Sequence, residues 1–101
     1  MKTVMIDGVE FRKVESPSDV KILVLNRGWV LVGRPQTEGE YTTISDCSVI
    51  RVWGTTKGLG EIAAGGPTSK TILDKCPNVT VHVSQVVLTM NCNGEAWTTK
   101  L

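Results

Sequence analysis

The chain has few aromatic residues, few cysteines, one histidine and no clear excess of either charge. Among its 101 residues are three Trp, one Tyr, one Phe, three Cys and one His. A core must therefore be built mainly from Val, Ile and Leu. One histidine leaves little material for a nucleophile–histidine pair, and no Gly-x-Ser-x-Gly motif occurs. We expect a single β-rich domain over residues 1–101, with no catalytic residue, no metal site and no cofactor.

The near balance of charge argues against two functions, non-specific nucleic-acid binding and mimicry of nucleic acid. Eleven Lys and Arg face ten Asp and Glu, for a net charge of +1. Proteins that bind the phosphate backbone of nucleic acids carry an excess of basic residues. Proteins that mimic nucleic acid carry a dense negative field. We expect neither function here. No apolar run reaches the length of a signal peptide or a membrane span. These features predict a cytoplasmic protein without a membrane partner.

The cysteines and the histidine do not have the spacing of a metal site. Cys47, Cys76, His82 and Cys92 are the right residue types for zinc, but no Cys-x-x-Cys knuckle is present. An odd number of cysteines without a secretion signal indicates reduced thiols rather than a disulfide framework. We expect small buried thiols, and an ordinary sheet position for His82.

The first third of the sequence predicts two β-hairpins. Residues 2–6 and 9–14 flank Asp7-Gly8, a dipeptide suited to a type I′ turn. Residues 20–25 and 29–33 flank Asn26-Arg27-Gly28, and a three-residue loop that ends in glycine is typical of a turn with a bulge.

The middle of the chain predicts a loop followed by strands. The polar run 34–40 contains Pro35 and Gly39 and is predicted to be a loop. Residues 41–44 and 48–53 are rich in β-branched and aromatic residues, which predicts two further strands.

The last part of the chain predicts one helix and more strands. Residues 58–64 have helical spacing, with Leu59, Ile62 and Ala63 on one side. Alternation predicts strands at 79–83 and 86–90, and the tail 91–97 is predicted to close with an edge strand. The fold class is therefore mainly β (α+β). We expect a small barrel-like or folded antiparallel sheet of about six to eight short strands with one short helix. Sheet edges that stay open would favour a homo-oligomer.

The segment from Trp53 to Thr71 is the most distinctive part of the sequence. It concentrates glycines, hydroxyl residues and two lysines directly after a strand-like run. Glycines allow backbone N–H groups to approach an anion, and lysines add positive charge. We predict that it binds a small anionic or nucleotide ligand without turning it over. The predicted ligand-binding residues are Arg51, Trp53, Thr55, Thr56, Lys57, Gly58, Gly60, Thr68 and Lys70.

A structural explanation of this segment stays open beside the binding one. The spacing is not that of a phosphate-binding P-loop, and Gly58-Leu59-Gly60 lacks the third glycine of a dinucleotide fingerprint. The glycines equally fit a strand-to-helix turn. Glu61 has a simple explanation as well, because an acidic residue at a helix start complements the helix dipole and caps backbone donors.

A second hypothesis is a protein-binding module that acts on a host protein through a sheet face or edge. Trp29 and Tyr41 are the candidate anchors, because large aromatic residues dominate protein interfaces. A tryptophan beside a loop equally suits stacking on a base, with Arg27, Arg34 or Arg51 pairing a phosphate.

The string Val49-Ile50-Arg51-Val52-Trp53-Gly54-Thr55-Thr56-Lys57-Gly58-Leu59-Gly60-Glu61, followed by Gly66-Pro67-Thr68 and Leu73-Asp74, resembles a signature of small phage and prophage proteins without an assigned function. The resemblance covers about the C-terminal half and implies a bacterial cytoplasm during phage infection. No residue role is carried over from that group. By analogy with other small phage accessory proteins, it suggests counter-defence, either by sequestering a signalling nucleotide or by capping a host protein.

Overall fold

The computed structural model describes residues 19–101, which form one antiparallel six-stranded sheet with two short α-helices. The strands are β1 (Lys21–Leu25), β2 (Val30–Glu38), β3 (Tyr41–Val52), β4 (Ile72–Lys75), β5 (Val79–His82) and β6 (Val86–Asn91). The helices are α1 (Leu59–Gly65) and α2 (Gly94–Trp97), with 3-10 turns η1 (Asn26–Gly28) and η2 (Val83–Gln85). The mainly β fold class is confirmed. The hairpin predicted over residues 2–14 lies outside the described residues.

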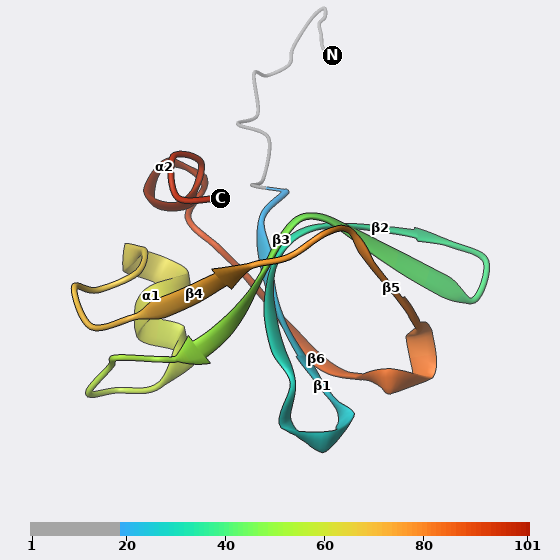
Figure 1. Cartoon of the computed structure of the whole chain (residues 1–101), viewed down its shortest axis with the longest axis horizontal. Coiled ribbons are helices and arrows are strands. Elements are labelled where there is room, and N and C mark those ends of the chain that lie inside the picture. Colours follow the sequence, from blue (N-terminus) through green and yellow to red (C-terminus); the bar gives the residue numbers. More distant parts are fainter. Residues whose placement is uncertain (1–18) are drawn as a thin grey trace, which may run out of the picture.

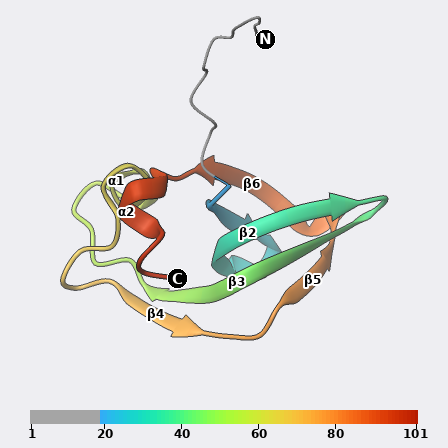
Figure 2. The same cartoon turned by 90° about the horizontal axis from the view of Figure 1, so that it is seen from above.

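Within residues 19–101 the sheet is bent but does not close into a barrel. Its strand order is β4-β3-β2-β1-β6, and β5 pairs with β3 beside β4. The long strand β3 therefore holds two short strands along one edge, β5 near its start and β4 near its end. The 3-10 turn η2 carries the chain from β5 to β6, which pairs with β1 (Figures 1 and 2).

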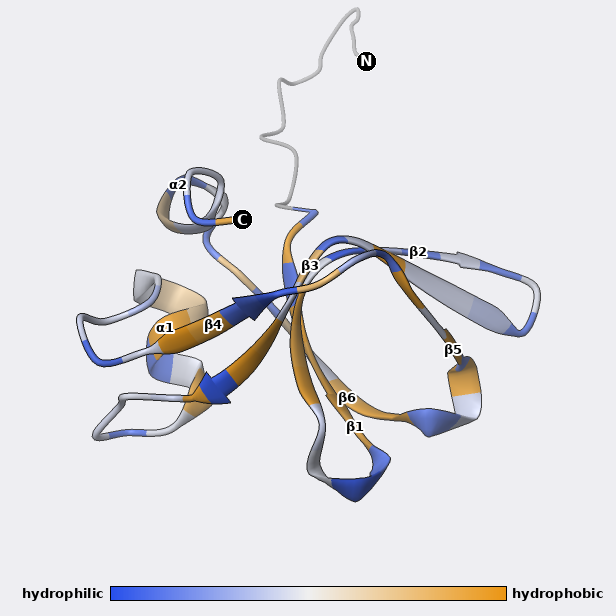
Figure 3. Ribbon diagram, in the orientation of Figure 1, coloured by the Kyte–Doolittle hydropathy of each residue, from blue (hydrophilic) through white to orange (hydrophobic). Residues whose placement is uncertain are grey.

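The central strands are buried on both faces, which explains their continuous apolar runs. Along β1, Ile22 belongs to a cluster that includes Leu59, Ile62 and Trp97 of the two helices. The next residue, Leu23, belongs to a second cluster on the opposite face. Figure 3 shows this apolar material in the middle of the sheet, and the tip of the β1–β2 turn is hydrophilic.

The two helices lie together at one end of the sheet, and the β2–β3 hairpin extends at the other (Figures 1 and 2). The predicted helix is confirmed: Leu59, Ile62 and Ala63 of α1 are buried. Trp97 of α2 is fully buried, and its indole Nε1–H donates to the Ile62 carbonyl at 2.8 Å. This hydrogen bond joins α2 to the middle of α1.

The hairpin predicted over residues 20–33 is confirmed, but the loop predicted over 34–40 is wrong. β2 continues to Glu38 and pairs with β3 as far as Tyr41. Backbone pairing satisfies N–H and C=O groups whatever the side-chain polarity, and Thr37 and Thr42 also join through their hydroxyls at 2.7 Å. β1 pairs with β2 only as far as Gly33, so among the described strands β2 has no second neighbour at Pro35.

Two further predictions are corrected. The strands expected at 41–44 and 48–53 are one strand, bent near Asp46, whose φ is 50°. The edge strand expected in the tail 91–97 is instead helix α2. The Asn93 side chain caps this helix by accepting from the Glu95 N–H at 3.0 Å. Burial of Trp97 then offsets the low stability of so short a helix.

Candidate ligand-binding site

The glycine-rich segment folds into two connections that are hydrogen-bonded to each other. One leads from β3 into α1, and the other leads from α1 into β4. The Thr68 hydroxyl donates to the Gly54 carbonyl at 2.8 Å, and the Thr71 hydroxyl donates to the Trp53 carbonyl at 2.7 Å. These threonines therefore hold the two connections together.

Gly54 is needed for this close approach. Its φ is +68°, and a Cβ built on it would lie 2.4 Å from the Lys70 carbonyl carbon. No L side chain fits there without moving the backbone. The structure thus gives Gly54 a packing role.

Glu61 occupies the backbone donors that an anionic ligand would need. Its Oε1 accepts from the Thr56 N–H at 3.1 Å and from the Lys57 N–H at 3.0 Å. The Thr55 hydroxyl accepts from the Gly58 N–H at 3.1 Å. A phosphate at these amides would compete with a carboxylate that already holds them.

The residues predicted to contact the ligand differ in whether they already have an ion-pair partner and in how exposed they are. The Arg51 guanidinium bonds the Asp74 carboxylate at 2.7 and 3.3 Å, and this partner raises the arginine pKa. Lys57 and Lys70 are exposed and have no ion pair within residues 19–101. Trp53 is 43% exposed, and Gly60 lies on the open surface of α1. Ligand binding by this segment stays a prediction.

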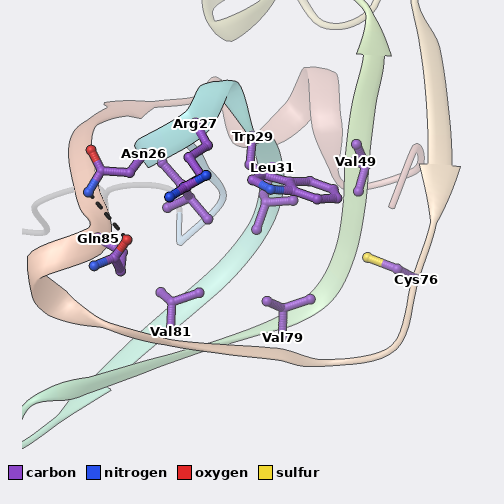
Figure 4. Close-up of a pocket in the computed structure, with 10 residues that line it drawn as sticks. Asn26, Arg27, Trp29, Leu31, Val49, Cys76, Val79, Val81 and Gln85 are labelled. Atoms are coloured by element: carbon purple, nitrogen blue, oxygen red, sulfur yellow. Dashed lines mark hydrogen bonds between the residues drawn. The ribbon is translucent and has the colours of Figure 1, made fainter.

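A pocket opens on the face of the bent sheet that the helices do not cover. Its volume is about 460 Å³, within the range of small-molecule sites. The β1–β2 turn, β3, β5 and η2 surround it (Figure 4). Its lining residues are Leu25, Asn26, Arg27, Trp29, Leu31, Val49, Cys76, Val79, Val81 and Gln85.

Most of the pocket wall is apolar, and its polar groups lie at one side. Leu25 and Leu31 are buried in the sheet, whereas Trp29 is 57% exposed at the mouth. Figure 4 shows the indole of Trp29 extending toward Val49 across the pocket. The Asn26 side-chain amide donates to Gln85 Oε1 at 3.3 Å and joins the β1–β2 turn to η2. The pocket therefore has an aromatic wall and a polar rim.

Arg27 stands on this rim in an unusual backbone conformation. Its φ and ψ are 71° and 17°, the left-handed region that non-glycine residues rarely adopt. It is exposed and has no carboxylate partner within the described part of the chain. Strained residues of this kind occur often at binding sites, so the geometry supports a role for its charge.

Trp29 and Arg27 were recognisable from the sequence, but the pocket itself was not. Its walls come from residues far apart in the chain, such as Leu31, Val49 and Val81. A partial signal exists in the alternation of the strands, because every second residue of each strand faces the same side. The face of the sheet that is left open as a pocket depends on how the strands pair, and the alternation within one strand does not show this.

Two of the three cysteines are buried thiols, and all three are free. Burial and the interaction with Cys76 raise the pKa of Cys47 to about 12. Burial also raises the pKa of Cys92 to about 11. Cys76 is half-buried and lines the pocket.

His82 bonds the Ser84 hydroxyl at 2.9 Å and Glu40 Oε1 at 3.0 Å, and its ring meets Tyr41 edge-on. Tyr41, the second predicted anchor, is 56% exposed beside it. Within residues 19–101, no group of three or more His, Cys, Asp or Glu could hold a metal ion. The same residues include no helix with the length and apolar character needed to cross a membrane.

No protein-family model matches the chain, and comparison with curated proteins gives no significant match. The resemblance to small phage and prophage proteins stays a prediction based on its motif. Function must accordingly be argued from the site.

Proposed function

We propose that this chain is a binding protein whose pocket holds a flat, largely apolar ligand with one anionic group. The observation that carries the proposal is the pocket of about 460 Å³ with apolar walls, an exposed tryptophan and an arginine at its rim. Trp29 would stack on the ring system of the ligand, and Arg27 would pair with its anionic group. A nucleotide has this chemistry, with a planar base and a phosphate.

This proposal keeps the predicted ligand class but moves the main site away from the glycine-rich segment. Near Glu61 the amides are already bonded to a carboxylate, whereas the Arg27 guanidinium has no carboxylate partner among residues 19–101. In the phage setting that the sequence motif suggests, such a protein would act by sequestering a signalling nucleotide. Its effect would then depend on protein concentration rather than on turnover.

A matched pair of fluorescent probes tests the pocket. 8-Anilinonaphthalene-1-sulfonate has a flat apolar body and a sulfonate, and N-phenyl-1-naphthylamine has the same ring system without the charge. We expect the protein to bind both probes and to prefer the sulfonate. Adenosine monophosphate should compete with either probe if the ligand is a nucleotide.

Three variants separate the contributions. Trp29→Ala should weaken both probes by about tenfold or more, because the aromatic wall is lost. Arg27→Gln should weaken only the sulfonate, by about 2- to 5-fold, the size of an exposed ion pair. The matched control combines Lys57→Gln and Lys70→Gln, which removes two exposed cations of the glycine-rich segment and should change neither affinity.

Two outcomes would contradict the proposal. If the lysine double variant loses the sulfonate probe while Arg27→Gln does not, the glycine-rich segment is the anion site. If Trp29→Ala binds both probes as tightly as the unmodified protein, the pocket is not the site. Circular dichroism and cooperative urea unfolding of each variant would show that the fold is retained, since partly folded proteins also bind such dyes.

A protein partner remains a second hypothesis, because Trp29 and Tyr41 are both more than half exposed. Tyr41 does not line the pocket. A partner that uses both anchors would therefore be weakened by Tyr41→Ala, whereas the small-molecule proposal expects no effect of that change.

A further inference from the structure

Cys47 lies in β3, and Cys76, the residue that directly follows β4, lies opposite it. Ser48 pairs with Lys75 across β3 and β4, and the two cysteines occupy the next position on each side. The Cys76 N–H donates to the Cys47 carbonyl at 2.9 Å, and the Cys76 thiol approaches the same carbonyl at 3.3 Å. They therefore form a cross-strand pair although 28 residues separate them in the chain.

Both thiols lie on the pocket face of the sheet. Cys47 belongs to the apolar cluster of Leu25 and Leu31, and Cys76 packs against that cluster. Cys47 is fully buried, whereas Cys76 lines the pocket, with its sulfur turned inward (Figure 4). Burial, and after it the neighbouring Cys76 thiol, raises the pKa of Cys47, which agrees with the closeness of the two side chains.

This arrangement comes close to the geometry of a disulfide. One backbone hydrogen bond joins Cys76 to Cys47, and directly opposite residues in such antiparallel pairs have Cα atoms about 4.5–5.5 Å apart, within the 4.4–6.8 Å range of disulfides. Their Cβ atoms are typically about 4.5–5.5 Å apart, slightly more than the 3.5–4.5 Å that a disulfide prefers. A bond can form if the strands draw together, and the resulting strain makes it easy to reduce.

We propose that Cys47 and Cys76 form a thiol–disulfide exchange site that reacts reversibly with low-molecular-weight disulfides such as oxidised glutathione. The Cys76 thiolate attacks one sulfur of the small disulfide, which releases one thiol and leaves a mixed disulfide. Cys47 then attacks the Cys76 sulfur, the Cys76–glutathione bond breaks, and the Cys47 proton passes to the departing sulfur, which leaves as the second thiol. Two protein thiols are oxidised to one disulfide, and the small disulfide is reduced to two thiols.

The structure assigns different roles to the two cysteines. Cys76 can be reached through the pocket and acts first. Cys47 has no exposed surface and acts only on the neighbouring mixed disulfide. This exchange chemistry does not depend on which ligand the pocket binds, so it can be tested separately from the proposed function.

Equilibration with mixtures of reduced and oxidised glutathione tests the proposal on the full chain. After acid quenching, the intact mass distinguishes an internal disulfide from a glutathione adduct. The equilibrium gives the effective concentration of the Cys47 thiol toward Cys76. We expect this effective concentration to be at least about tenfold higher in the native protein than in the protein unfolded by urea, because folding holds the two thiols together. Low protein concentration and non-reducing electrophoresis exclude disulfides between chains.

Cysteine variants identify the pair and its order of reaction. Cys92 lies in the other apolar cluster, so Cys92→Ala is the matched control and should form the disulfide as the unmodified chain does. Cys47→Ser should stop at a stable glutathione adduct on Cys76. Cys76→Ser should leave Cys47 unreacted. Cys47→Ala gives a second version in case a serine hydroxyl in the core prevents folding.

The proposal is overturned if native and urea-unfolded protein give the same effective concentration. Accumulation of glutathione adducts without an internal disulfide in the unmodified chain would also overturn it. So would a disulfide that involves Cys92 in the native state.

Discussion

Replacing Arg27 by asparagine should stabilise the protein while weakening anion binding. Arg27 sits in the β1–β2 turn with a φ of 71° and is followed by Gly28 with a φ of 84°. Asparagine tolerates the left-handed conformation better than arginine, since its short side chain can bond locally. The variant would also contain Asn-Gly, a preferred dipeptide for turns with positive φ.

The expected gain in stability of Arg27→Asn follows from the backbone conformation at this position. The left-handed region costs an ordinary L residue about 1–2 kcal/mol, of which asparagine recovers a part. We expect a gain of about 0.5–1 kcal/mol in the free energy of unfolding. For a domain of this size, that gain corresponds to a rise of about 2–8 °C in melting temperature.

Urea unfolding and thermal melting measure the effect, and Arg27→Gln is the control. Glutamine removes the charge as asparagine does, but it gains nothing in the left-handed region. Its stability should stay within about 0.5 kcal/mol of the unmodified protein. Both variants should lose the preference for the sulfonate probe. Comparing the two thus separates the backbone conformation from the charge.

The reasoning fails if Arg27→Asn and Arg27→Gln have the same stability, because the left-handed conformation would then carry no measurable cost. A loss of stability in both variants would mean instead that the arginine side chain stabilises the fold. Gain of stability with loss of binding would match the known conflict between stability and function at strained sites.

Four further predictions concern the core, a turn, helix α1 and the dependence of stability on pH. Trp97→Phe should lower the free energy of unfolding by about 1–3 kcal/mol in urea titrations, because the buried Ile62 carbonyl loses the indole donor and a gap is left; an unchanged midpoint would contradict this. Gly54→Ala should destabilise by about 2 kcal/mol or more, since its Cβ would lie 2.4 Å from the Lys70 backbone. Gly60→Ala, in open space on α1, should instead be neutral or stabilise by up to about 1 kcal/mol. Burial raises the pKa of Cys92 from 9.0 to about 11, so the unfolded state loses this proton first and stability should fall as pH rises from about 9 to 11. Between pH 8 and pH 10.5, this thiol should account for about 1–2 kcal/mol of the loss in the free energy of unfolding. Urea titrations at the two pH values should show a loss that is smaller by this amount in Cys92→Ala.

The parts of the fold that could be predicted are those set by neighbouring residues. The hairpin around Asn26-Arg27-Gly28 depends on a short turn between two apolar runs, and α1 depends on the spacing of Leu59, Ile62 and Ala63. Both signals lie within a dozen residues, so they can be recognised without knowing the rest of the structure.

The incorrect predictions fall where distant contacts override local preference. Residues 34–38 have loop-like composition but pair with β3, which supplies the hydrogen bonds that a polar strand needs. In the tail, residues 94–97 form a helix because Trp97 is buried against Ile62. Neither partner can be identified from the segment alone.

Sequence alone determined that this protein is mainly β, with one short helix before Gly65-Gly66 and a turn at Asn26-Arg27-Gly28. These features follow from periodicity and from the conformational limits of a few residues. Only the tertiary structure decided where a ligand would fit. The register of β3 with β4 and β5 brings Val49, Cys76 and Val81 around one pocket, and the same register places Cys47 opposite Cys76. The physical reason is that strand pairing joins residues without regard to their separation in the chain, so the sites it creates leave little trace in local sequence.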